Sequence, residues 1–140
     1  MKFTLNIMPP KATHQGSLAI LHRRGGGMFV GKKRSSKGAM AVQLLSVHLL
    51  PFRPATPFEG PLRLKVLWVY PWGCKHRKKD RARGEIPCAT SPDCDNLSKS
   101  LCDILGKQGF YNDDGQIADL QFGKRYGDRP RIEIEIERMR

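Results

Sequence analysis

The chain has 140 residues and a mass of 15.8 kDa, which is the size of one domain whose core needs no disulfide or structural metal. It carries 25 Lys and Arg against 13 Asp and Glu, for a formal net charge of +12, and this excess favours a nucleic acid as partner over a membrane surface. No stretch reaches the roughly 18 apolar residues of a membrane span, and the apolar N-terminal run is short and interrupted, so we expect a cytoplasmic protein with free thiols.

The first half of the chain begins with a short alternating segment. Residues 2–8 alternate apolar and polar side chains and predict a strand that ends at Pro9. Two apolar runs near 18–21 and 28–30 flank a segment rich in Gly and Arg, and they indicate a hairpin whose basic residues are explained equally well as solvated surface.

A helix and the clearest strand of the sequence follow. Apolar spacings of three and four predict a helix over 37–50, terminated by Pro51. Residues 62–70 alternate, and their second face becomes apolar towards the end, so we expect a central strand. The basic run 75–83 is typical of a solvated loop, but it leads directly into an acidic segment, so contact with phosphates is an equal alternative. Its basic side chains are Lys75, Arg77, Lys78, Lys79, Arg81 and Arg83.

The last third of the chain is helix and then strands. One apolar stripe predicts a helix over 95–107, and alternation predicts strands over 116–124 and 131–138. The expected fold is therefore α/β: a single small domain over 1–140, with a mixed β-sheet and about two helices.

Two tight groups of aspartates stand out in so basic a chain. They are Asp93 with Asp95, at the start of the second helix, and Asp113 with Asp114, before the next strand. Carboxylate oxygens are the ligands that Mg²⁺ prefers, so the groups suggest a metal ion beside a nucleic-acid phosphate. We expect the short turn between helix and strand to bring Asp93, Asp95 and Asp114 together. Helix capping accounts for one of these carboxylates and not for the whole set.

Lys99 lies one helical turn after Asp95. It is placed to neutralise charge that develops on the phosphate during hydrolysis, or it forms an ordinary exposed salt bridge to a neighbouring aspartate. A zinc site at Cys74, His76, Cys88 and Cys94 is a weaker hypothesis, because the paired Cys-x-x-Cys knuckle is missing.

The spacing of these residues resembles a known family. Residues 92–117 contain Pro-Asp-x-Asp-Asn-Leu-x-Lys, then Asp103, then Asp-Asp-x-Gln-Ile, and this arrangement is similar to the signature of the RusA-type Holliday junction resolvases. The Pro-Pro-Lys after the first strand and the Pro-Phe-Glu-Gly-Pro-Leu before the central strand resemble family motifs more loosely.

The resemblance implies a RusA-like endonuclease domain in which Asp93, Asp95 and Asp114 bind Mg²⁺, or Mn²⁺ in its place, and Lys99 assists. It also implies a homodimer that cuts four-way DNA junctions by paired nicks in recombination and repair, in a bacterial, phage or prophage setting. Two alternatives stay open: a metal-dependent nuclease of broader structural specificity, and a non-catalytic basic protein that binds nucleic acid.

Overall fold

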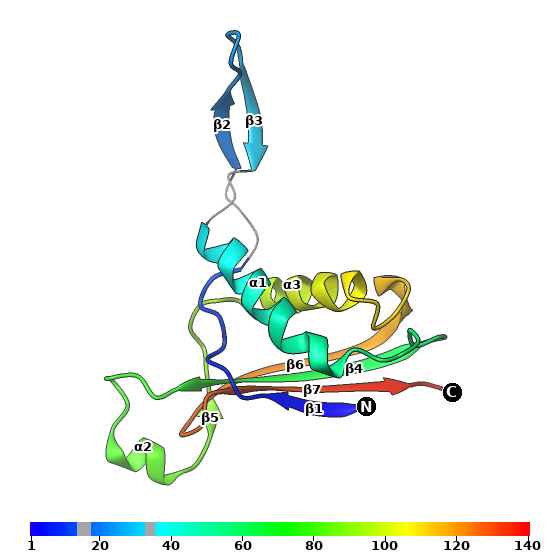
Figure 1. The fold of residues 1–140 in the computed structure, drawn as a ribbon. Helices are drawn as coiled ribbons and strands as arrows, with labels where there is room; N and C mark the ends of the chain where they lie inside the picture. Colours follow the sequence, from blue (N-terminus) through cyan, green and yellow to red (C-terminus); the bar gives the residue numbers. More distant parts are fainter. Residues whose placement is uncertain (14–17, 33–35) are drawn as a thin grey trace.

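The computed structural model describes residues 1–13, 18–32 and 36–140. A five-stranded mixed sheet carries two long helices on one face, and a two-stranded hairpin projects on the helix side (Figure 1). The order of the strands across the sheet is β1 (Lys2–Leu5), β7 (Arg131–Arg138), β4 (Leu62–Pro71), β6 (Ile117–Gly127) and β5 (Ile86–Pro87). The predicted α/β class is confirmed.

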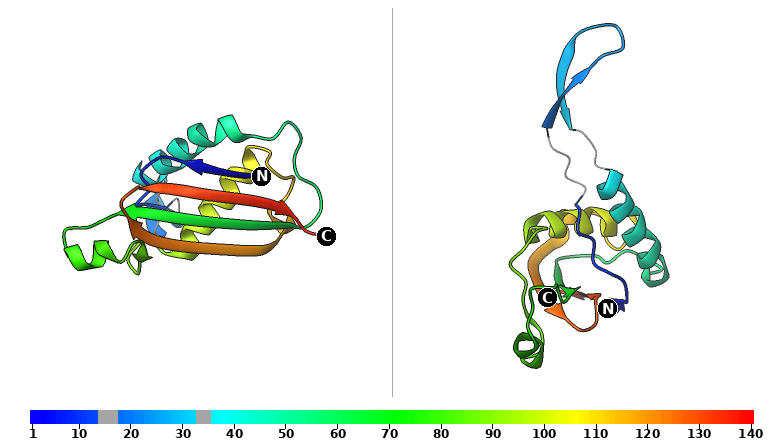
Figure 2. Two further views of the ribbon diagram at one scale, coloured as in Figure 1. Left: turned by 90° about the horizontal axis from the view of Figure 1, so that it is seen from below. Right: turned by 90° about the vertical axis from the view of Figure 1, so that its left-hand side faces the viewer.

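The two long helices are α1 (Ser36–Leu49) and α3 (Cys94–Lys107). Helix α3 connects the parallel strands β4 and β6, while every other neighbouring pair in the sheet is antiparallel. A parallel pair needs such a crossover, because its strands cannot be joined by a tight turn. Seen from below, the second face of the sheet carries neither long helix (Figure 2). Helices α1 and α3 therefore lie on the same side of the sheet.

The core lies between the sheet and these helices. Strand β4 buries one face along its whole length, and Trp68 and Leu62 have no exposed surface. Strand β7 alternates buried isoleucines with partly exposed glutamates over most of its length. Helix α3 buries the apolar stripe expected from its spacing. As predicted, β4 is central, between β7 and β6.

Several local predictions were wrong. The first strand ends at Leu5, which pairs with Ile132, so residues 7 and 8 would lie opposite positions that precede the first residue of β7, Arg131. The basic run is not a plain loop but contains a short helix, α2 (Lys78–Ala82), whose first turn is capped when the Arg77 backbone NH donates to the Asp80 carboxylate at 3.0 Å. Strand β5 and the 3-10 turn η1 (Leu50–Phe52) were not predicted, whereas the turn expected before the strand after α3 is present as the 3-10 turn η2 (Asp114–Gln116).

The hairpin consists of β2 (Leu18–His22) and β3 (Met28–Lys32), close to the two runs expected from the sequence. Its turn contains Gly26 and Gly27, both with φ above 90°. Side chains other than glycine rarely adopt this conformation, so the glycines fix where the chain reverses.

Candidate active site

Asp93 and Asp95 lie at the N-terminal end of α3. Asp93 is the N-cap residue with extended backbone, yet its side chain makes no capping hydrogen bond, and Asp95 is exposed in the first turn. An aspartate at this position usually accepts a hydrogen bond from the first turn of the helix. The Asp93 carboxylate does not, so capping does not explain its presence. Both carboxylates face solvent and are available to a ligand.

Lys124 of β6 holds the segment that leads into Asp93. Its ammonium group donates to the carbonyl oxygens of Thr90, at 2.5 Å, and Pro92, at 2.6 Å. The hydroxyls of Thr90 and Tyr126 lie 2.6 Å apart. The sequence did not reveal this role, because Lys124 is one of 25 basic residues and nothing local distinguishes it. The clamp fixes the backbone immediately before the first carboxylate group.

The thiol of Cys88 belongs to the same small network. Its burial acts to raise its pKa, but hydrogen bonds with Tyr126 and Thr90 and the charge of Lys124 outweigh burial and lower the pKa. The strand β6 side chains therefore set both the position and the electrostatics of the segment before Asp93.

The second carboxylate group is built on the turn η2. The Asp113 side chain accepts a hydrogen bond from the Gly115 backbone NH at 2.7 Å, and the Gln116 side chain accepts from the Asn112 and Asp113 backbone NH groups. The Gln116 amide also donates to the Phe58 and Gly60 carbonyls, at 3.0 and 3.1 Å. These bonds give Asp113 and Gln116 structural roles.

Asp114, in contrast, is exposed, and among the described residues none hydrogen-bonds to or forms an ion pair with its carboxylate. Its nearest titratable surroundings lie at the C-terminal half of α3. Burial raises the pKa of the Cys102 thiol to about 11, and the charges of Asp103 and Asp114 add to that shift. Burial likewise raises the pKa of Tyr111, whose hydroxyl donates to the Cys102 carbonyl at 2.7 Å. Asp103 and Asp114 therefore both lie near Cys102, in the C-terminal half of the helix whose N-terminal end carries Asp93.

Within one chain the two groups are held apart. Asp114 lies near Cys102, and at 1.5 Å per residue helix α3 puts a rise of roughly 14 Å between Asp93 and Cys102. Among the described residues no three His, Cys, Asp or Glu side chains come close enough to hold a metal ion. The expectation that the short turn would bring Asp93, Asp95 and Asp114 together was wrong, because the turn joins the far end of the helix to β6.

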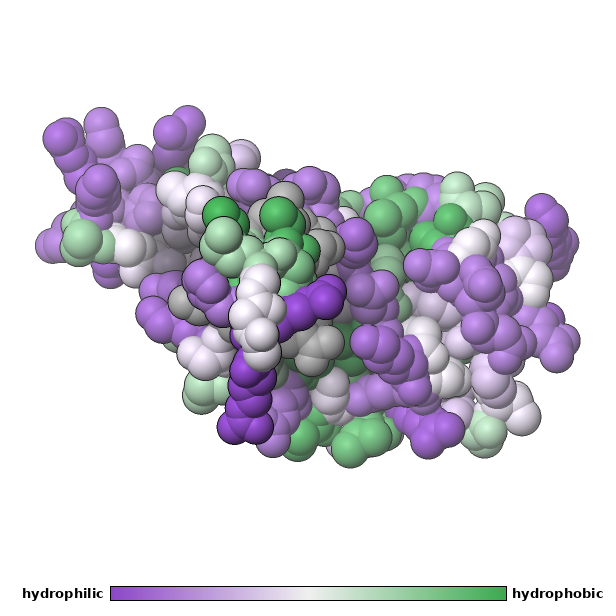
Figure 3. Space-filling view, turned by 90° about the horizontal axis from the view of Figure 1, so that it is seen from above, coloured by the Kyte–Doolittle hydropathy of each residue, from purple (hydrophilic) through white to green (hydrophobic). Residues whose placement is uncertain are grey.

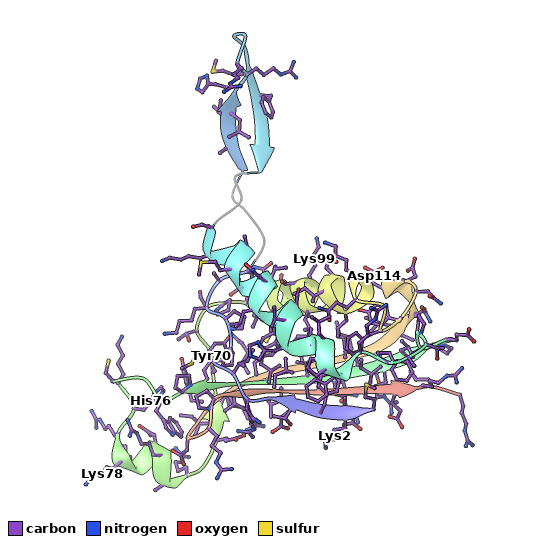
Figure 4. All side chains as sticks on the ribbon, viewed as in Figure 1. Lys2, Tyr70, His76, Lys78, Lys99 and Asp114 are labelled. Atoms are coloured by element: carbon purple, nitrogen blue, oxygen red, sulfur yellow. The ribbon has the colours of Figure 1, made fainter. Side chains whose placement is uncertain are left out.

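Lys99 lies on the exposed side of α3, between the two groups in sequence (Figure 4). In the part of the chain that the structure describes, no acidic side chain forms a salt bridge with it. The spacing of four puts Asp95, Lys99 and Asp103 on one side of the helix, and all three are exposed. The salt-bridge explanation of Lys99 is therefore not realised.

The basic run lies at one end of the molecule, where Figure 4 places Lys78 far from Asp114. Its six predicted phosphate contacts are all exposed: Lys75, Arg77, Lys78, Lys79, Arg81 and Arg83.

The zinc hypothesis receives no support, since His76 accepts a hydrogen bond from the Gly73 backbone NH at 2.8 Å and packs against Trp72 and Tyr126. All four cysteines are free.

Comparison with known proteins decides the family. The family model described as endodeoxyribonuclease RusA matches residues 8–137. The chain belongs to the RusA endodeoxyribonuclease family. A protein of Lactococcus phage r1t named crossover junction endodeoxyribonuclease rusA is 31% identical over 137 residues, which cover 96% of this chain and 94% of the phage protein. The Bacillus subtilis (strain 168) protein YqaN is 33% identical over 134 residues, covering 90% and 94%.

RusA membership confirms the predicted enzyme class, an endodeoxyribonuclease that hydrolyses phosphodiester bonds, and the assignment to the junction resolvases. A nuclease of this family acts on DNA, which agrees with the basic charge. Among the described residues no helix is long and apolar enough to cross a membrane. The RusA match spans both carboxylate groups and the helix that separates them.

Proposed function

We propose that this chain resolves four-way DNA junctions as a metal-dependent homodimer, by paired and symmetric nicks, in recombination and repair. The observation that carries the proposal is the pair of exposed carboxylate groups at opposite ends of α3, which form no metal-holding cluster of three among the described residues. Neither group alone offers more than two well-placed carboxylates, whereas the chemistry of the combined set fits Mg²⁺ or Mn²⁺.

The residues that would hold the ion are Asp93, Asp95 and Asp114. A bound divalent ion lowers the pKa of a coordinated water and stabilises charge on the leaving oxygen. Lys99 contributes a positive charge from the same side of α3 as Asp95, and it orients the scissile phosphate and offsets the negative charge that develops on it.

The separation of the groups also explains why the working unit is a dimer. A two-fold axis that sets two copies of α3 side by side in opposite directions brings Asp93 and Asp95 of one chain towards Asp114 of the other. Two-fold dimers are the commonest closed assemblies, and this one contains two such sites, which is the number that paired nicks require. Each site then takes carboxylates from both chains.

The basic run supplies phosphate contacts away from the site. Its six exposed cations are Lys75, Arg77, Lys78, Lys79, Arg81 and Arg83. Their distance from Asp114 suits arms of the junction more than the scissile phosphate (Figure 4). Contacts of this kind position the DNA and weaken with salt, and they do not read its sequence.

The test compares cleavage of four-way, three-way and linear DNA with and without Mg²⁺. The proposal predicts paired nicks in the four-way junction that depend on the metal. Equal cutting of all branched substrates would favour a nuclease of broader specificity, and binding without cleavage under every condition would favour a non-catalytic protein. Mn²⁺ should substitute for Mg²⁺, because both accept oxygen ligands.

A further inference from the structure

The β2–β3 hairpin has one open apolar face. Ile20 pairs with Val30 across the two strands. Met28 precedes Val30 by two residues and lies on the same face of the hairpin. Their exposed fractions are 65% for Ile20, 69% for Val30 and 70% for Met28. Unless another surface packs on this face, three large apolar side chains remain in water, on the hairpin that projects away from the core (Figure 1).

The opposite face of the hairpin is covered only in part, by its own residues, and Phe29 on it is 41% exposed. Leu21 lies over Gly31, where an added Cβ would come within 2.6 Å of the leucine Cδ1. The Arg23 guanidinium lies 5.5 Å from the centre of the Phe29 ring. The two faces therefore differ in degree: among the described residues, the apolar side chains of the face with Ile20, Met28 and Val30 are the more exposed.

Helix α1 has a second uncovered apolar surface. Met40, Leu44 and Val47 follow a spacing of four and three along its outer side, with exposed fractions of 69%, 40% and 56%. Together with Lys11 and Ala12 they line a groove of about 520 Å³. Viewed from above, apolar residues reach the surface on the hairpin and elsewhere on this side of the molecule (Figure 3).

The hairpin does not cover the groove of its own chain. It points away from the sheet and both long helices (Figure 1), and its extensive contacts are those between its own two strands. An isolated two-stranded hairpin is at best marginally stable in water and needs an apolar surface to pack on. The chain thus carries an exposed apolar hairpin face and an apolar groove on α1, and either surface could cover the other.

We propose that the hairpin of one chain packs its Ile20, Met28 and Val30 face into the α1 groove of a second copy, and that the second copy returns the contact. A two-fold axis repeats the contact: the hairpin of each chain packs into the groove of the other, so the assembly closes at two chains. The proposal rests on the homodimer of the proposed function and not on its metal or its DNA. It names the surface that holds the dimer together.

Sedimentation equilibrium of the metal-free, DNA-free protein tests this arrangement. The wild-type chain should sediment as a dimer of 15.8 kDa subunits. The double variant Ile20→Glu and Val30→Glu should raise the dimer dissociation constant by about a hundredfold or more, because two carboxylates would have to enter an apolar groove. Leu44→Glu should act in the same direction from the other side of the contact.

Matched controls put the same charge beside the proposed contact. Ala19→Glu lies on the opposite face of the hairpin, one residue from Ile20, and Ala39→Glu is exposed on α1 and does not line the groove. Both should leave the dissociation constant within a few-fold of wild type. A monomeric wild-type protein, or a hairpin double variant as dimeric as wild type, overturns the exchange.

Cross-linking gives a readout that does not depend on how well the charged variants fold. In a Cys74→Ser background, a Val30→Cys chain mixed with a Leu44→Cys chain and oxidised should give a disulfide-linked species with the mass of one chain of each kind. The mixture of Ala19→Cys with Leu44→Cys should not. Absence of the cross-linked pair in the first mixture overturns the proposal.

These experiments separate the exchange from the proposed function. If the wild-type dimer fails to cut junctions but the hairpin variants dissociate it, the proposed activity is wrong and the exchange stands. If junctions are cut in the presence of metal but the hairpin variants remain dimers, the exchange is wrong and the activity stands.

Discussion

Replacing Lys124 by Met should weaken the fold and the activity together, because Lys124 clamps the segment that precedes Asp93. The ammonium group makes two charge-assisted hydrogen bonds to backbone carbonyls, one partly buried and one exposed. Such bonds are worth about 1.5–3 kcal/mol each when shielded. Because exposure reduces one of them, we expect a combined loss of about 2 kcal/mol, and Met keeps most of the aliphatic stem.

For a domain of this size a loss of 1 kcal/mol lowers the melting temperature by roughly 4 °C, so Lys124→Met should melt about 8 °C below wild type. Arg125→Met is the matched control, since Arg125 is the next residue of β6 and is exposed. Calorimetry and a junction-cleavage assay would measure both effects. A change of melting temperature under 1 °C with unchanged turnover would refute the clamp.

Three further predictions concern the core, the pH response and the transition state. Leu101→Ala should cost about 2–5 kcal/mol of unfolding free energy, because Leu101 has no exposed surface; a loss under 1 kcal/mol in denaturant titration would contradict this packing. The hydrogen bond from Arg63 holds the pKa of Asp119 below its usual value, so the stabilisation is present above about pH 3.9 and is lost as pH falls through the lower folded-state pKa. The melting temperatures of wild type and Arg63→Met should therefore differ at pH 7 and converge in acid, and a constant difference would count against the pair. Lys99→Met should lower turnover by orders of magnitude with little change in melting temperature, and intact specific activity would exclude its role at the phosphate.

Most of the fold follows from short-range patterns in the sequence. The alternation of β4 and β7 and the apolar stripe of α3 each specify a face, and the buried residues are the ones that those patterns select. Features that depend on distant partners were not predictable. The two-residue strand β5 exists only because β6 runs beside it, and β1 stops close to the point where β7 begins.

The candidate site shows the same division. The sequence identified Asp93, Asp95, Asp114 and Lys99, and the structure leaves all four exposed. The sequence did not predict how far apart these residues lie. The prediction considered only the short turn after α3 and left out the length of the helix before it. Lys124 was invisible for a related reason: its partners are backbone carbonyls more than thirty residues away in sequence.

The most direct test of a site shared between two chains is subunit mixing. Asp93→Asn and Asp114→Asn homodimers should both fail to cut four-way junctions. In a mixed dimer, one site receives both substitutions and the other receives none, so mixing should restore single nicks, up to about half of the dimers for random exchange. If the mixture stays as inactive as its two components while exchange of subunits is confirmed by mass, the site lies within one chain and the account is wrong.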